Sequence, residues 1–238
     1  MSQTSLNKIE DIFTALGGKF IISPKDMKNA LSRVKCFVFD WDGVFCSGKK
    51  GEKGFGSFSE PDSMGINLLR YGFYLINNEL PFISIITGES NKTAEQFAKR
   101  EHFSLVYSRI KDKKIALSHL CKTESLNHDQ ISFVYDDVND LSMAKDCGLK
   151  IQVNRDSSPL FKRFTLEHSF CDYRTGYTGE QYAVREVCEL LLGLMEVYDK
   201  VVKNRAAFDQ TYCSYLKAKN RIKPQFFFSR DGHIYEGR

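Results

Sequence analysis

The sequence predicts an α/β protein built on a doubly wound, Rossmann-like parallel sheet. Three largely apolar runs of strand length, at 36–39, 81–88 and 131–135, alternate with segments of helical periodicity, and polar residues end or follow each run. Strands buried on both faces are apolar throughout, and their alternation with helices is typical of parallel sheets. Right-handed crossovers then place the carboxyl ends of these strands along one edge.

The composition is that of a globular protein. With 238 residues, 42% of them hydrophobic, the chain can bury a large core, which excludes the disordered and fibrous classes. The net charge of +4 is mild and lies after residue 195, where nine basic residues face five acidic ones. No aromatic-basic motif accompanies this charge, so we expect no nucleic-acid partner.

The seven cysteines are odd in number and contain no Cys-x-x-Cys pair, which indicates reduced thiols in a cytoplasmic protein. The chain starts without the pattern of a signal peptide, and no apolar run reaches the length of a membrane span. We therefore expect no membrane partner.

The first 33 residues form a predicted helical extension. Leu6, Ile9 and Phe13 repeat at helical spacing, and Ser23 followed by Pro24 is typical of the start of a second helix.

Beyond the first strand, the segment 45–59 is rich in Gly, Lys and Ser, with residues 48–51 at the expected tip of a hairpin. Its aromatic residues need a partner surface, which favours self-association.

The remaining elements follow in order. We expect helices at 63–78, 91–102, 109–121 and 143–147, and further strands at 104–107 and 149–153. An amphipathic helix follows over 184–194, and the segment 196–238 is a tail with helical spacing at 208–216. The run Pro224 to Phe228 is expected to expose its aromatic side chains to a neighbouring subunit.

Acidic and hydroxyl residues follow the three main strands. Asp40 and Asp42, then Thr87, then Asp136 and Asp137 would meet at one edge of the sheet. Clustered carboxylates need a counter-cation, and oxygen ligands favour Mg²⁺, which suits a phosphate. One carboxylate could act as nucleophile and a second as general acid and base. Taken singly, each of these features is more often a turn or a helix cap.

Together these residues resemble the four motifs of the haloacid dehalogenase superfamily of phosphatases. The likeness rests on Phe39-Asp40-Trp41-Asp42-Gly43-Val44, Ile85-Ile86-Thr87-Gly88, Lys113 and Asp136-Asp137-x-x-Asp140. The segment 177–188, with its Ala-Val-Arg-Glu-Val helix, is similar to the capless branch of octulosonate 8-phosphate and nonulosonate 9-phosphate phosphatases. The likeness implies a phosphatase domain over 34–195 and a homotetramer whose hairpins pair.

The resemblance also implies roles for single residues. Asp40 would be the nucleophile and a Mg²⁺ ligand, Asp42 the general acid and base and a ligand through its backbone carbonyl, and Asp136 the third ligand. The phosphoryl group would be held by Thr87 with Gly88 and by Lys113, with Lys114 as the alternative lysine. Asp137 and Asp140 would orient Lys113 or metal-bound waters.

Three positions depart from the branch. Tyr135 stands where the last motif usually begins with Gly, and would lie beside the metal site. Glu89 replaces an Arg of the octulosonate enzymes, which favours a nonulosonate 9-phosphate, and residues 60–65 alter the expected substrate-facing loop.

The leading hypothesis is a Mg²⁺-dependent phosphatase for a phosphorylated acidic sugar. The alternative is a catalytically weak or inactive oligomerisation or regulatory module, and a nucleic-acid-binding protein is the weakest reading.

Overall fold

The computed structural model describes residues 3–51, 54–55 and 57–237. Its main sheet has nine strands in the order β1-β9-β8-β7-β2-β5-β6-β10-β11. The seven inner strands are parallel, while the two edge strands β1 and β11 are antiparallel to their neighbours. The bounds are β1 Lys19–Phe20, β2 Cys36–Phe39, β5 Phe82–Ile86, β6 Leu105–Ser108, β7 Ile131–Tyr135, β8 Leu149–Gln152, β9 Tyr173–Arg174, β10 Gln225–Arg230 and β11 His233–Glu236.

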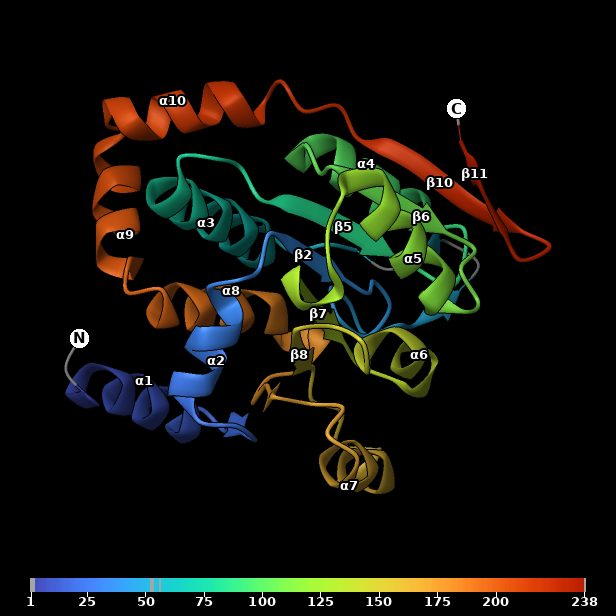
Figure 1. The fold of residues 1–238 in the computed structure, drawn as a ribbon, viewed down its shortest axis with the longest axis horizontal. Helices are drawn as coiled ribbons and strands as arrows, with labels where there is room; N and C mark the ends of the chain where they lie inside the picture. Colours follow the sequence, from blue (N-terminus) through green and yellow to red (C-terminus); the bar gives the residue numbers. More distant parts are fainter. Residues whose placement is uncertain (1–2, 52–53, 56, 238) are drawn as a thin grey trace.

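Helices cover both faces of this sheet, which confirms the predicted doubly wound α/β fold (Figure 1). In β2, Phe37 and Phe39 belong to one core cluster, whereas Cys36 and Val38 belong to the other. Because side chains alternate along a strand, a strand covered on both faces has to be apolar at every position. The helices are α1 Gln3–Ala15, α2 Pro24–Leu31, α3 Glu60–Asn77, α4 Lys92–Glu101, α5 Lys113–Glu124, α6 Leu141–Ala144, α7 Pro159–Glu167, α8 Ala183–Leu194, α9 Tyr198–Ala207 and α10 Gln210–Lys219.

The N-terminal helices form where the sequence predicts them. The Ser23 side chain accepts a hydrogen bond from the Asp26 backbone N–H at the start of α2. Leu6 and Phe13 of α1 are buried, and α1 packs on α2 and α8. The extension is therefore part of the same core as the sheet.

The hairpin is shorter than expected and begins later. Strands β3 (Lys50–Gly51) and β4 (Gly54–Phe55) pair antiparallel, so Lys50 lies in a strand and not at the tip. Residues 52–53 and the side chain of Phe55 lie outside the described residues. Phe45, expected on an exposed arm, is instead buried and stacks on Trp41 at 5.0 Å between ring centroids. Burial in the core of its own chain already removes this ring from water, so it needs no partner surface.

The C-terminal tail joins the fold of its own chain. Figure 1 shows α9 and α10 passing around α3 before the chain returns as β10 beside β6. Tyr212 and Tyr215 of α10 are buried against Tyr71 of α3. Phe227 is buried and stacks on Tyr107. The expectation that 224–228 exposes its aromatic residues is wrong: Phe227 is buried, and Phe226 and Phe228 are half-buried beside β6.

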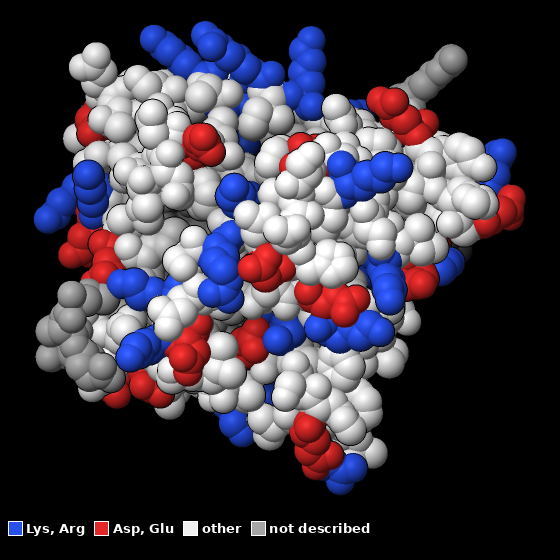
Figure 2. Space-filling model, in the orientation of Figure 1, with Lys and Arg blue, Asp and Glu red and all other residues white. Residues whose placement is uncertain are grey.

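Acidic and basic side chains are mixed over the face drawn in Figure 2, with several basic ones projecting along the edge where α10 lies. Among the described residues, no helix is both long and apolar enough to cross a membrane.

Candidate active site

A cavity of about 320 Å³ opens beyond the carboxyl ends of the central strands. It lies where the strand order reverses, because β5 and β6 follow β2 on one side and β7 and β8 lie on the other. Open parallel sheets bind ligands at such switch points. Most of the predicted site residues line it: Asp40, Asp42, Gly88, Glu89, Lys113, Asp136, Asp137 and Asp140.

Thr87 is the predicted residue that does not line this cavity. Its side chain is 1% exposed, and its hydroxyl has no hydrogen-bond partner among the described residues. Its backbone N–H donates to the Tyr107 carbonyl, and its own carbonyl accepts from Ile110. A buried hydroxyl without a partner is costly, so its position beside the cavity suits an oxygen-rich ligand.

Asp40 and Lys113 form a buried ion pair at the base of the cavity. Asp40 follows β2 directly, and Lys113 is the first residue of α5, which Asp112 caps through the Lys114 backbone N–H. The Lys113 ammonium donates to Asp40 Oδ1 at 2.5 Å and also contacts Asp140. Lys114, the alternative lysine, is exposed.

Asp140 organises the loop after β7. Its Oδ2 accepts the backbone N–H groups of Asp136 at 3.3 Å and Asp137 at 3.1 Å, while its other oxygen contacts Lys113. Asp140 is buried, with an exposed fraction of 1%. It positions both Asp136 and Lys113.

The turn after Asp40 separates two chemically different side chains. Trp41 is fully buried in the core, whereas Asp42 faces the cavity and pairs with Lys50 at 3.3 Å. Gly43 then adopts φ of +87°, a conformation that favours glycine. This turn aims both Asp40 and Asp42 at the cavity.

The carboxylates at this edge suit a divalent cation. One oxygen each of Asp40, Asp136 and Asp140 lies within 4.8 Å of the others. Burial and the neighbouring Asp140 charge raise the pKa of Asp40 to about 7, against the opposing effect of Lys113. Burial and the charges of Asp40 and Asp140 raise the pKa of Asp136 to about 8. Ionising both therefore calls for more positive charge, and an all-oxygen donor set fits Mg²⁺.

The predicted ligand set and this cluster overlap but differ. Both contain Asp40 and Asp136, while the cluster has Asp140 where the prediction has Asp42. Asp140 is already occupied by Lys113 and two backbone N–H groups. Asp40 and Asp136 are the side chains that the prediction and the cluster have in common, although each also pairs with a basic residue.

Glu89 lies at the rim of the cavity, with its side chain half exposed. It accepts a hydrogen bond from Lys111 at 2.6 Å, and this contact lowers its pKa. Asp137, also at the rim, caps the following turn through the Val138 backbone N–H.

Two expectations about the surroundings are wrong. Tyr135 points away from the cavity: its hydroxyl donates to the Phe170 carbonyl at 2.7 Å, and its ring stacks on Phe133 in the core. Adjacent side chains on a strand face opposite ways, so Asp136 and Tyr135 are separated. Residues 60–65 do not form a substrate-facing loop, because they are the first turns of α3, where Asp62 is buried.

Arg155 is a residue of this cavity that the sequence analysis missed. It lies three residues beyond β8, and its guanidinium donates to Asp136 Oδ2 and lies 3.6 Å from Asp137. The signal that could have found it is its place after the fourth parallel strand, since that strand ends at the same edge.

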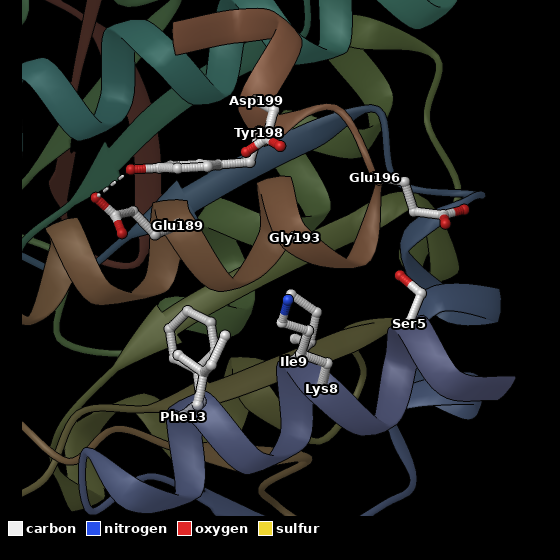
Figure 3. Close-up of a pocket in the computed structure, with 10 residues that line it drawn as sticks. Ser5, Lys8, Ile9, Phe13, Glu189, Gly193, Glu196, Tyr198 and Asp199 are labelled. Carbon is white, nitrogen blue, oxygen red and sulfur yellow. Dashed lines mark hydrogen bonds between the residues drawn. The ribbon is translucent and has the colours of Figure 1, made fainter. Parts of the chain in front are cut away.

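A second cavity, of about 540 Å³, lies between α1, α8 and α9 (Figure 3). Ile9 and Phe13 point into it from α1, and Glu189 on the other side accepts a hydrogen bond from Tyr198. The predicted site residues all lie elsewhere, so this cavity is not the candidate site.

Most of the chain is similar to several known proteins. No protein-family model matches the chain. A 3-deoxy-D-manno-octulosonate 8-phosphate phosphatase of Yersinia pestis is 28% identical over 172 residues, covering 70% of this chain and 84% of that protein. The Escherichia coli K12 phosphatase of the same name is 29% identical over 164 residues, covering 67% and 79%.

Two solved structures are similar as well. The Moraxella catarrhalis phosphatase of that name was determined in complex with a magnesium ion, a phosphate ion and a KDO molecule. It has a TM-score of 0.63 at 26% identity and covers 78% of this chain and 99% of that one. A Legionella pneumophila hydrolase of the haloacid dehalogenase superfamily, subfamily III A, has a TM-score of 0.63 at 27% identity and covers 77% and 95%.

Proposed function

Because the chain has the haloacid dehalogenase fold and is similar to its octulosonate 8-phosphate phosphatase branch, we propose that it is a Mg²⁺-dependent phosphatase of phosphorylated acidic sugars. The observation that carries the proposal is the buried group of Asp40, Lys113, Asp136 and Asp140 beside the cavity. A structural ion-pair cluster of the same residues would not need a 320 Å³ opening.

The residues of the site divide the reaction between them. Asp40 and Asp136, with the Asp42 backbone carbonyl, would hold Mg²⁺, which when bound neutralises charge on the phosphate and the carboxylates. Lys113 and the Thr87 hydroxyl bind phosphoryl oxygens, and Gly88 leaves room for them. Asp140 positions Lys113, and Asp137 supports the loop that carries Asp136.

Two displacement steps at phosphorus follow. A carboxylate oxygen of Asp40 attacks the phosphorus, and the sugar alcohol leaves with a proton from Asp42. Asp42 then takes a proton from water, which attacks the aspartyl-phosphate and restores Asp40 with release of inorganic phosphate. Asp42 lines the cavity outside the three-carboxylate cluster, where its pair with Lys50 leaves it within reach of a substrate.

Glu89 supports a finer proposal about the substrate. A negative charge at the rim, next to Lys111, disfavours a substrate carboxylate at that point and accepts hydrogen bonds from hydroxyl or amino groups. We therefore favour a nonulosonate 9-phosphate over an octulosonate 8-phosphate. Three of the similar proteins are named octulosonate 8-phosphate phosphatases, so the assay must include both substrates.

The test is phosphate release from a panel of sugar phosphates with either Mg²⁺ or EDTA. We expect Mg²⁺-dependent release that falls by at least about a thousandfold in Asp40→Asn, since the nucleophile is lost. Asp231→Asn, which removes an exposed carboxylate at the β10–β11 turn, is the matched control. Equal phosphate release by Asp40→Asn and wild type would overturn Asp40 as the nucleophile. No release from any substrate would favour the non-catalytic module instead.

A further inference from the structure

Arg155 holds one of the two carboxylates proposed for the metal. Its guanidinium bridges Asp136 and Asp137, and its side chain is 37% exposed at the cavity wall. The pair fits closely under Gly43: a Cβ built there would run into both the Asp136 carboxylate and the Arg155 guanidinium. The turn is thus shaped to let this arginine reach Asp136.

A divalent cation bound at this cluster would compete with Arg155 for Asp136. Both are positive and both would use the same carboxylate, so a cation held by Asp40 and Asp136 would come close to the guanidinium. Even if the cation takes the other oxygen of Asp136, the two positive charges repel each other. Asp137 provides Arg155 with a second carboxylate at the rim, 46% exposed, to which it can remain attached.

The other cations of the cavity are less suited to binding a second acidic group. Lys113 is committed to Asp40 and Asp140, while Lys50 and Lys111 are flexible amines paired with other acids. Arg155 is the arginine among the described residues that line the cavity. Its planar guanidinium can donate two parallel hydrogen bonds to one carboxylate.

We propose that Arg155 exchanges the Asp136 carboxylate for a carboxylate of the substrate when Mg²⁺ binds, and so selects phosphomonoesters that carry a second acidic group. This inference rests on the proposed function. It places the carboxylate-binding cation after β8, on the side of the cavity where β7 and β8 end, and gives Glu89 the opposite task of binding neutral or amino groups.

The first test is Mg²⁺ binding by calorimetry, which needs no activity. We expect Arg155→Ala to tighten Mg²⁺ binding by at least about threefold, because a competing cation is removed. An arginine that merely supported the metal ligands would give the opposite sign, since loss of such support ordinarily weakens affinity by about 10–100-fold. Arg163→Ala, which removes an exposed arginine of α7, is the control.

The second test compares octulosonate 8-phosphate with its methyl ester at saturating Mg²⁺, and likewise the nonulosonate pair. We expect wild type to prefer the free acid, and both Arg155→Ala and Arg155→Lys to reduce that preference by about tenfold, mainly through KM. Thermal unfolding confirms that each variant is folded.

The outcomes separate this inference from the proposed function. Unchanged or weaker Mg²⁺ binding in Arg155→Ala overturns the competition, and an unchanged acid-to-ester ratio overturns the role in selection. No phosphate release by wild type would instead contradict the proposed function, and the selection role with it, while the Mg²⁺ titration would still decide the competition.

Discussion

Gly43 shows how a single residue fixes the geometry of the site. Its positive φ turns the chain after Asp42, and the absent side chain leaves room for the pair of Asp136 and Arg155. Gly232, at φ of +77°, has the same backbone requirement but open space around it. Comparing an alanine substitution at each glycine therefore distinguishes the cost of backbone strain from the cost of a steric clash at the site.

We predict that Gly43→Ala loses at least about a hundredfold in phosphate release and has clearly weaker Mg²⁺ binding, because the new methyl group displaces Asp136. Gly232→Ala should cost only about 1 kcal/mol of stability, from the left-handed backbone alone, with activity unchanged. Steady-state kinetics and urea unfolding of both variants make the comparison. Similar losses of activity in both would contradict the steric account.

For single residues, the sequence predicted the site correctly where a functional side chain directly follows a strand. Asp40, Thr87 and Asp136 each stand next to an apolar run, and parallel packing brings these ends together. Arg155 lies further into a loop, and its reach to Asp136 depends on side-chain geometry that no periodicity encodes. Tyr135 was misplaced because adjacency in sequence was taken for adjacency in the site.

Among the elements, α3 and α8 form the most extensive helix pair, and Asp62 joins their ends. Its Oδ1 accepts the Arg185 backbone N–H at 2.9 Å, and Ser59 donates to its Oδ2. Burial raises the pKa of Asp62 to about 6, more than these hydrogen bonds lower it. The folded protein therefore holds this proton more tightly than the unfolded chain does.

This shift predicts the direction of a pH effect. Between about pH 4 and 6 the folded state carries more protons than the unfolded state, so Asp62 makes stability fall as pH rises through this window. Asp62→Asn keeps an acceptor for Arg185 and removes the titration. Its stability relative to wild type should rise by up to about 3 kcal/mol from pH 4 to pH 7, measured by urea unfolding.

Asp231→Asn serves as the control for this series, because its carboxylate is exposed. If the difference in free energy of unfolding between Asp62→Asn and wild type stays constant from pH 4 to pH 7, the pKa of Asp62 is not raised and the prediction fails.

The elements themselves were largely predictable, and the errors have physical causes. Caps such as Ser23 and Pro24 fixed the start of α2, since the local sequence decides a helix terminus. The hairpin was misplaced because Gly-rich segments specify strand register weakly. Phe45, assigned to an exposed arm, found the core beside Trp41 and Phe97.

For the whole molecule, the chief difference is the tail. The sequence suggested that 224–228 seeks a neighbouring subunit, yet β10 pairs with β6, 119 residues away at the contact between Ser108 and Phe227. Such a long-range parallel pairing leaves no local signal in the sequence. The homotetramer stays a prediction, which now rests on the family resemblance and the hairpin, and no longer on exposed aromatic residues of the tail.

The central claim is that Asp40 carries the phosphoryl group during turnover. The direct measurement is acid quenching of the protein with Mg²⁺ and ³²P-labelled sugar phosphate, followed by peptide mapping by mass spectrometry. We predict a hydroxylamine-labile label on Asp40 in wild type, and none in Asp40→Asn. Phosphate release without any labelled Asp40, or a label on another residue, would contradict the account.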